Sequence, residues 1–212
     1  MKLSEELIIQ TTENFFSYIE EYLPDGKRKT KLIDYYKSIE LLLATAPASS
    51  NVNYHNCFAG GYVEHVNRVV QAALVLNNVW DRFGQEKNYT IEELVFSAIN
   101  HDLGKLGTNE VPHYIPNSSE WHVKNQGKVY TVNPAESYMD VPTRSIFRLQ
   151  QAGIEISENE YLSILLHDGL YSEANKPYLM APTPETQLKT NLPHIIHQAD
   201  LMASKIEKTL NK

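Results

Sequence analysis

The chain has 212 residues and a formal net charge of −7, and 42% of its residues are hydrophobic. This composition is typical of a globular domain, and the single cysteine, Cys57, excludes an internal disulfide framework and a cysteine-based zinc site. The negative charge disfavours broad binding to extended nucleic acid. It does not exclude small phosphorylated substrates, because a bound cation can supply positive charge locally.

No apolar run approaches the roughly 18 residues that a membrane-spanning helix needs. The first residues turn acidic at once, with Glu5 and Glu6, and lack the apolar core of a signal peptide. We therefore expect a cytoplasmic protein that does not span a membrane.

Apolar residues at helical spacing predict an all-α fold with a single domain over residues 1–212. Helices are predicted over residues 3–22, 29–46, 62–83, 142–151 and 192–210. Two more are predicted to begin at capping boxes, Thr90 with Glu93 and Ser157 with Glu160. Residues 1–50 form a helical extension at the N-terminal end, and residues 171–184 are predicted to be a loop.

Residues 106–141 interrupt the helical pattern with several prolines and glycines. Within them, residues 121–132 are predicted to form a β-hairpin with Gly127 in its turn. A long insertion in a compact helical domain is typical of a lid or a substrate wall, with disorder as the alternative. Trp121 and Tyr130 could close over a base or sugar, and a purely structural flap is the alternative.

The pair His101–Asp102 ends the apolar helix that follows Thr90. A neutral imidazole and a carboxylate are both good ligands for a divalent metal ion. Adjacent residues on a helix point about 100° apart, so both reach one ion only if it lies beyond the helix end. The same stretch is equally compatible with a helix C-terminus capped by Gly104.

Other predicted helices carry further ligand types: His65 in the first turn of one, His167 at the end of another, and Asp200 near the end of the chain. Asp200 lies among apolar residues, where a carboxylate is costly unless it is paired or metal-bound. His197 shares its helix face, whereas His194 lies about 120° away. Any one of these residues alone could be structural, but the set predicts a metal site. His55, His113 and His122 lie in predicted loops and are given no role.

His65, the His101–Asp102 pair and Asp200 together resemble the HD superfamily of metal-dependent phosphohydrolases. The segment YHNCFAGGYVEH, residues 54–65, is similar to the HHxxxGGLxEH stretch of HD modules attached to some bacterial 3′→5′ exoribonucleases and of small phage-encoded HD proteins. Residues 101–105 match the form HDxGK, and residues 166–171 and 196–200 resemble the later motifs. The resemblance covers residues 51–207 as an HD core, with 1–50 and the hairpin outside it.

The resemblance implies an HD-type helical bundle that binds one or two divalent ions, with Mn, Fe, Zn, Ni and Mg all compatible. Its motifs assign a first ion to His65, His101, Asp102 and Asp200. Asp102 would bridge to a second ion completed by His167 and by His197, which is preferred on face geometry, with His194 as the alternative.

The implied function is the hydrolysis of a small phosphorylated substrate, a nucleotide or a nucleotide-derived phosphoester, by a metal-activated water. Asp102 and Lys105 are the expected catalytic residues, with Lys105 at a phosphate oxygen. Arg144, Arg148 and Lys176 are candidates for further phosphate contacts, and surface solvation is the alternative for each. Two other functions stay open: a di-iron oxygenase of the same fold, and a non-catalytic sensor of metal and nucleotide.

Overall fold

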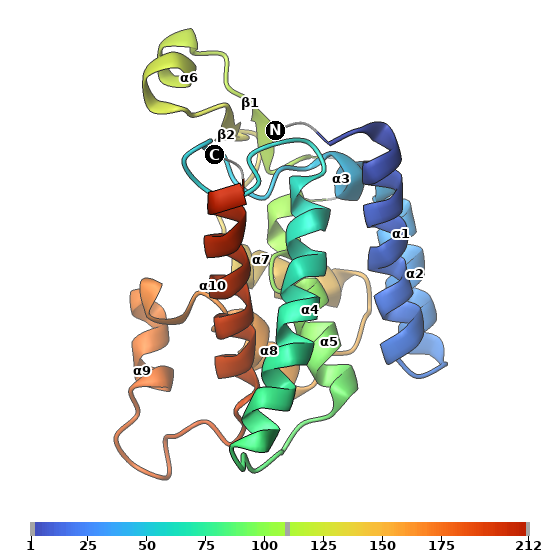
Figure 1. Cartoon of the computed structure of the whole chain (residues 1–212), viewed down its shortest axis with the longest axis vertical. Helices are drawn as coiled ribbons and strands as arrows, with labels where there is room; N and C mark the ends of the chain where they lie inside the picture. Colours follow the sequence, from blue (N-terminus) through green and yellow to red (C-terminus); the bar gives the residue numbers. More distant parts are fainter. Residues whose placement is uncertain (1–2, 109–110, 211–212) are drawn as a thin grey trace.

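The computed structural model describes residues 3–108 and 111–210. The predicted domain over 1–212 and the predicted insertion over 106–141 therefore include a few residues, 1–2, 109–110 and 211–212, that lie outside the described part. It confirms an all-α fold with one small sheet (Figure 1). The α-helices are α1 (Glu5–Tyr22), α2 (Lys27–Ser38), α3 (Glu40–Thr45), α4 (Gly61–Arg82), α5 (Ile91–Asn100), α6 (Glu120–Gln126), α7 (Val141–Gln151), α8 (Glu158–Leu165), α9 (Lys176–Leu179) and α10 (Leu192–Leu210). Short 3₁₀ turns are η1 (Leu103–Leu106), η2 (Gly169–Tyr171) and η3 (Glu173–Asn175), and the strands are β1 (Tyr114–Pro116) and β2 (Tyr130–Val132).

Helices α4 and α10 lie side by side at the centre of the molecule, and α5 and α8 pack against them (Figure 1). Val66, Val69 and Val70 of α4 are fully buried. One continuous hydrophobic cluster joins residues of these helices with residues of α1, α2 and α7. The two N-terminal helices therefore share the core of the rest of the chain. Within the described ranges, no helix has both the length and the apolar content needed to cross a bilayer.

Local capping signals place two important helices. Both predicted capping boxes are present, with Thr90 at the start of α5 and Ser157 at the start of α8.

The predicted helix over 29–46 is wrong in one respect, because it is divided at Ile39 into α2 and α3. The Ser38 hydroxyl donates to Tyr35 O, and Ile39 N bonds to Tyr36 O, so the last turn of α2 tightens and the regular ladder ends there.

The predicted hairpin over residues 121–132 is wrong, since its first half is helix α6. Ser119 accepts a hydrogen bond from the backbone of His122, and Gly127 ends the helix in a left-handed conformation. The alternating apolar residues were too few to distinguish a strand from a short capped helix. The strand that pairs with β2 is β1, antiparallel, with Tyr114 opposite Val132. The predicted loop over 171–184 contains η3 and the short helix α9.

The insertion lies at one end of the helical bundle (Figure 1). Three hydrogen bonds tie it to the loop between α3 and α4: Asn51 Nδ2 to Gln126 O at 2.8 Å, Val52 N to Gly127 O at 2.9 Å, and Tyr130 N to Ser50 O at 3.0 Å. It is therefore anchored against the loop that carries His55.

A buried hydrogen-bond chain fixes the last turn of α5. The Tyr36 hydroxyl donates to Asn100 Oδ1 at 2.8 Å, and Asn100 Nδ2 donates to Phe96 O at 2.8 Å. Tyr36 and Asn100 are both fully buried. An extension helix, α2, thus holds the residue that directly precedes His101.

Replacing Tyr36 by Phe leaves the buried Asn100 Oδ1 without its donor. We expect the free energy of unfolding to fall by about 1–3 kcal/mol, the usual effect of an unsatisfied buried polar group. Urea unfolding followed by circular dichroism measures it. Tyr138→Phe is the matched control, because Tyr138 is 96% exposed. Equal stability of the two variants would contradict the interpretation.

Candidate metal centre

The His101–Asp102 pair lies where α5 changes into a 3₁₀ turn. The α-helix ends at Asn100 and η1 begins at Leu103, and in this turn His101 Nε2 and Asp102 Oδ2 come within 3.4 Å. Ser145 of α7, which is fully buried, accepts from Gly104 N at 2.8 Å and donates to His101 O at 3.0 Å. Gly104 lies inside the turn, where an added Cβ would clash with the Val141 carbonyl. The pair thus converges beyond the helix end.

Two further ligand types reach this point from distant parts of the chain. His65 Nε2 of α4 lies 3.5 Å from Asp102 Oδ2, 3.4 Å from His101 Nε2 and 3.1 Å from Asp200 Oδ1 of α10. Ligand atoms that share one ion at about 2.0–2.2 Å are themselves about 3–3.5 Å apart. The buried cluster of His65, His101 and Asp102 could therefore hold a metal ion, with Asp200 beside it.

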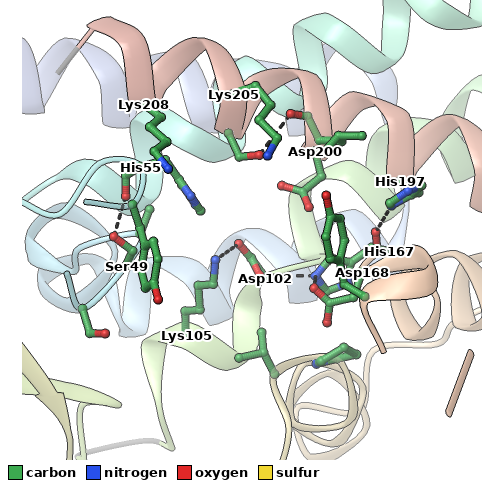
Figure 2. A pocket seen from close by; sticks show the side chains of 18 of the residues that line it. Ser49, His55, Asp102, Lys105, His167, Asp168, His197, Asp200, Lys205 and Lys208 are labelled. Carbon is green, nitrogen blue, oxygen red and sulfur yellow. Dashed lines mark hydrogen bonds and ion pairs between the residues drawn. The ribbon is translucent and has the colours of Figure 1, made fainter. Parts of the chain in front are cut away.

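Asp102 presents its two oxygens to different partners. Oδ2 faces His65 and His101, whereas Oδ1 lies 3.5 Å from His167 Nε2. Figure 2 shows His167 and Lys105 on opposite sides of Asp102. Asp168 Oδ1 lies 3.7 Å from the same His167 nitrogen. His167 therefore lies at the carboxylate oxygen of Asp102 opposite to the one that faces His65 and His101.

Each histidine has its Nδ1 engaged, which leaves Nε2 available as a ligand. His101 Nδ1 donates to Ala98 O and His167 Nδ1 donates to Ile164 O, both at 2.8 Å. A carbonyl oxygen can only accept, so Nδ1 carries a proton, and in the neutral ring the Nε2 lone pair is free to bind a metal. Partners of this kind orient metal-binding histidines and raise their basicity.

His65 has a different partner, Glu207, whose Oε2 lies 2.9 Å from His65 Nδ1. Glu207 is 1% exposed, and its other oxygen accepts from Arg68 Nε at 3.1 Å. Sequence reasoning missed Glu207. The available signal was its position seven residues after Asp200, two turns along the same face of α10.

Burial lowers the pKa of His167, but the hydrogen bond to Asp102 and the charges of Asp168, Asp102 and Asp200 outweigh it and raise the pKa to about 9. For His65, burial acts against the charge of Glu207 and the hydrogen bonds to acidic groups, and the pKa is raised well above its usual value. Burial would raise the pKa of Asp102, but Lys105 and His101 hold it well below its usual value. The centre thus keeps its carboxylates ionised and attracts positive charge.

Comparison with models of known protein families, with curated proteins and with solved structures found no match to this chain.

A cavity of about 660 Å³ opens onto these residues (Figure 2). It brings together five of the predicted site residues: Asp102, Lys105, His167, His197 and Asp200. Lys105 Nζ lies 2.5 Å from Asp102 Oδ2, and its side chain is only 15% exposed. Lys205 and Lys208 of α10, and Tyr114 of β1, add to the lining. We refer to this space as the metal cavity.

The structure does not bring Arg144 and Arg148 to the metal cavity. The Arg144 guanidinium is buried, where it donates to Ser137 O at 3.1 Å and pairs with Glu136 at 3.2 Å. Arg148 donates to Gly107 O at 2.6 Å and is also buried. A buried guanidinium needs such partners, so both arginines hold neighbouring segments in place instead of facing a ligand.

Lys176, Trp121 and Tyr130 also lie outside the lining of the metal cavity. Lys176 pairs with Glu173 at 2.7 Å on the surface, and Trp121 is 59% exposed on α6. Trp121 lies on helix α6, where a strand of the hairpin was predicted. Tyr114, in the strand that was not predicted, is the insertion's aromatic residue in the cavity.

His194 and His197, both on α10, lie in different surroundings. His197 lies at the edge of the metal cavity, and its Nδ1 donates to His167 O at 2.7 Å. Among the described residues it forms no ion pair with Asp102 or Asp200. His194 stacks on Trp80 with the ring planes 6° apart and is not part of the metal cavity. The separation of His194 from Asp200 agrees with the angle of about 120° between them that the helical periodicity predicts.

His55 is a second residue to which sequence reasoning gave no role. Its ring lies 4.6 Å from that of His65, and its buried Nε2 has no hydrogen-bond partner among the described residues. Burial, His65 and Lys105 lower its pKa to about 2, so it is neutral. The signal was its position ten residues before His65, within the segment that carries the family resemblance.

Replacing Glu207 by Gln removes the carboxylate that holds the His65 ring. We expect the affinity for a divalent ion to fall about 10–100-fold, as is typical for partners of metal-binding histidines. Competition with a chelating dye measures this affinity. Glu64→Gln is the control, because Glu64 also pairs with Arg68, at 3.2 Å, without contacting His65 Nδ1. Equal losses in both variants would contradict the role of Glu207.

Metal binding requires neutral histidines, so it must displace protons. Because the pKa of His167 is raised to about 9, its ring is protonated below that pH and neutral above it. We expect the apparent affinity to increase as the pH rises towards about 9. Calorimetry in buffers of different ionisation enthalpy counts the protons released. His167→Asn should release fewer, whereas His122→Asn, on exposed α6, should not change the count; a buffer-independent heat would contradict the prediction.

Proposed function

We propose that this protein is an HD-type metal-dependent phosphohydrolase that acts on a nucleotide or a nucleotide-derived phosphoester. The observation that carries the proposal is the convergence of His65, His101, Asp102 and Asp200 beside a cavity whose lining includes Asp102, Asp200 and Lys105. Phosphoester hydrolysis requires a water of lowered pKa and positive charge near the phosphoryl oxygens, and this set of residues suits both.

A first divalent ion would be held by His65, His101, Asp102 and Asp200, and a second by the free oxygen of Asp102 with His167. Such an ion lowers the pKa of a bound water and neutralises charge on a phosphoryl oxygen. The chain itself orients the ligands: Ala98 O, Ile164 O and Glu207 fix the three imidazole rings before any ion arrives. Little reorganisation then accompanies binding.

The charge of the lining supports an anionic substrate. The metal cavity is lined by four aspartates and three lysines, Lys105, Lys205 and Lys208. A single divalent ion therefore makes the formal charge of the lining positive, although the whole chain carries −7. Lys105, nearly buried against Asp102, can contact a phosphate oxygen as a fixed point charge. Binding of the metal and of the anion would thus favour each other.

The alternatives make different demands on the same residues. A di-iron oxygenase requires a late histidine as a further ligand, and His197, which lines the metal cavity, forms no ion pair with Asp102 or Asp200 within the described residues. A sensor would bind metal and nucleotide without turnover. No observation favours either, so hydrolysis is the function that the geometry supports best.

We expect Asp102→Ala and Asp102→Asn to abolish metal-dependent hydrolysis over a panel of nucleoside phosphates and cyclic nucleotides, because both remove the carboxylate that faces His65, His101 and His167. Product release measures the activity, and circular dichroism checks the fold. Asp34→Ala, an exposed aspartate on α2, is the control. Unchanged activity in the Asp102 variants would refute the proposal, and tight nucleotide binding without any product would favour the sensor.

A further inference from the structure

A second cavity, of about 400 Å³, lies next to the metal cavity and is called the side cavity here. The two cavities share Tyr171, His197 and Leu201 as lining residues. A ligand seated at the metal centre can therefore extend past these three side chains into the side cavity. Its volume falls in the range of about 300–1,000 Å³ that is usual for small-molecule sites.

The side cavity has a different chemistry from the metal cavity. Its described lining residues include no Asp, Glu, Lys or Arg, and three of them are leucines, Leu170, Leu179 and Leu201. Tyr171 and His194 add ring faces. Leu170 is 52% exposed and Tyr171 is 76% exposed. The lining thus offers apolar area and rings without any charge.

Helix α10 separates the two cavities by its own periodicity. Asp200 faces the metal cavity alone, whereas His194 faces the side cavity alone. His197 and Leu201, three and seven residues after His194, lie on the face between them. A single rigid helix therefore sets the separation between the charged and the apolar position.

His197 is locked in place at this boundary. Its Nδ1 donates to His167 O at 2.7 Å, and its ring packs on Gly169, which has φ +57°. An added Cβ at Gly169 would overlap the imidazole ring, so only glycine permits this contact. The fold therefore holds the His197 side chain in a fixed position between the two cavities.

We propose that the side cavity binds the nucleobase of the substrate while the phosphate lies at the metal centre. A base is a flat, uncharged ring system that stacks on aromatic faces and buries apolar area, which matches this lining. The inference rests on the proposed function. It assigns a position to the base of that substrate, and it predicts that a sugar phosphate without a base binds more weakly than a nucleotide.

The test uses Leu179→Trp, because Leu179 lines the side cavity alone and a larger side chain there fills the space of the base. Met180→Trp is the matched control, since Met180 is the next residue and is 63% exposed outside the lining. With the metal-loaded protein, we expect Leu179→Trp to raise KM for nucleoside phosphates at least about tenfold. Ribose 5-phosphate, which lacks the base, should be turned over by this variant as by the wild type.

A second readout needs neither metal nor turnover, so it separates this inference from the proposed function. Adenosine, guanosine, cytidine and uridine are titrated into the metal-free full chain, and NMR shifts of the leucine methyl groups are followed. We expect shifts at Leu179 and Leu201 for at least one nucleoside, about tenfold weaker binding in Leu179→Trp, and unchanged binding in Met180→Trp. Absence of binding by every nucleoside, or equal weakening in both variants, overturns the inference, whatever the hydrolysis assays show.

Discussion

The structure depends on the burial of one carboxylate. Asp102 is 2% exposed and ionised, and a charge in this position destabilises a fold unless it is paired and hydrogen-bonded. Its partners are Lys105 and three histidines that come from α4, from the turn after α5 and from the turn after α8. Only the assembled bundle supplies them together. The helices therefore meet at the point where the chemistry is proposed to occur, so stability and function depend on the same contacts.

His101 and His167 are oriented by the same kind of local hydrogen bond. His101 and His167 each follow an apolar helix, and each donates Nδ1 to the carbonyl three residues earlier. The last carbonyls of a helix have no partner within it, so such a histidine satisfies one of them and presents Nε2 outward. His65 lies in the first turn of α4, where carbonyl oxygens are already used by the helix. Its acceptor has to come from another element, and Glu207 of α10 provides it.

The periodicity of helix α10 places charged and uncharged residues on two neighbouring faces. One face carries Asp200 and Glu207 to the metal centre, and the neighbouring face carries His194, His197 and Leu201 to an uncharged space. The charged and the apolar positions are thereby held on one rigid element. This separation is what a substrate with a phosphate at one end and a flat ring at the other would require.

Periodicity and capping act within one or two turns of chain, so the helices α1, α4, α5, α7, α8 and α10, both capping boxes and the types of ligand could be predicted from the sequence. Which residues share the cavity could not be predicted, because it depends on contacts between distant segments. His65 and Glu207 are 142 residues apart, and no local pattern encodes their contact. The same holds for Arg144, Arg148 and Tyr114. Their places depend on how the insertion packs, and the insertion contains α6, a seven-residue helix whose caps outweighed its alternating pattern.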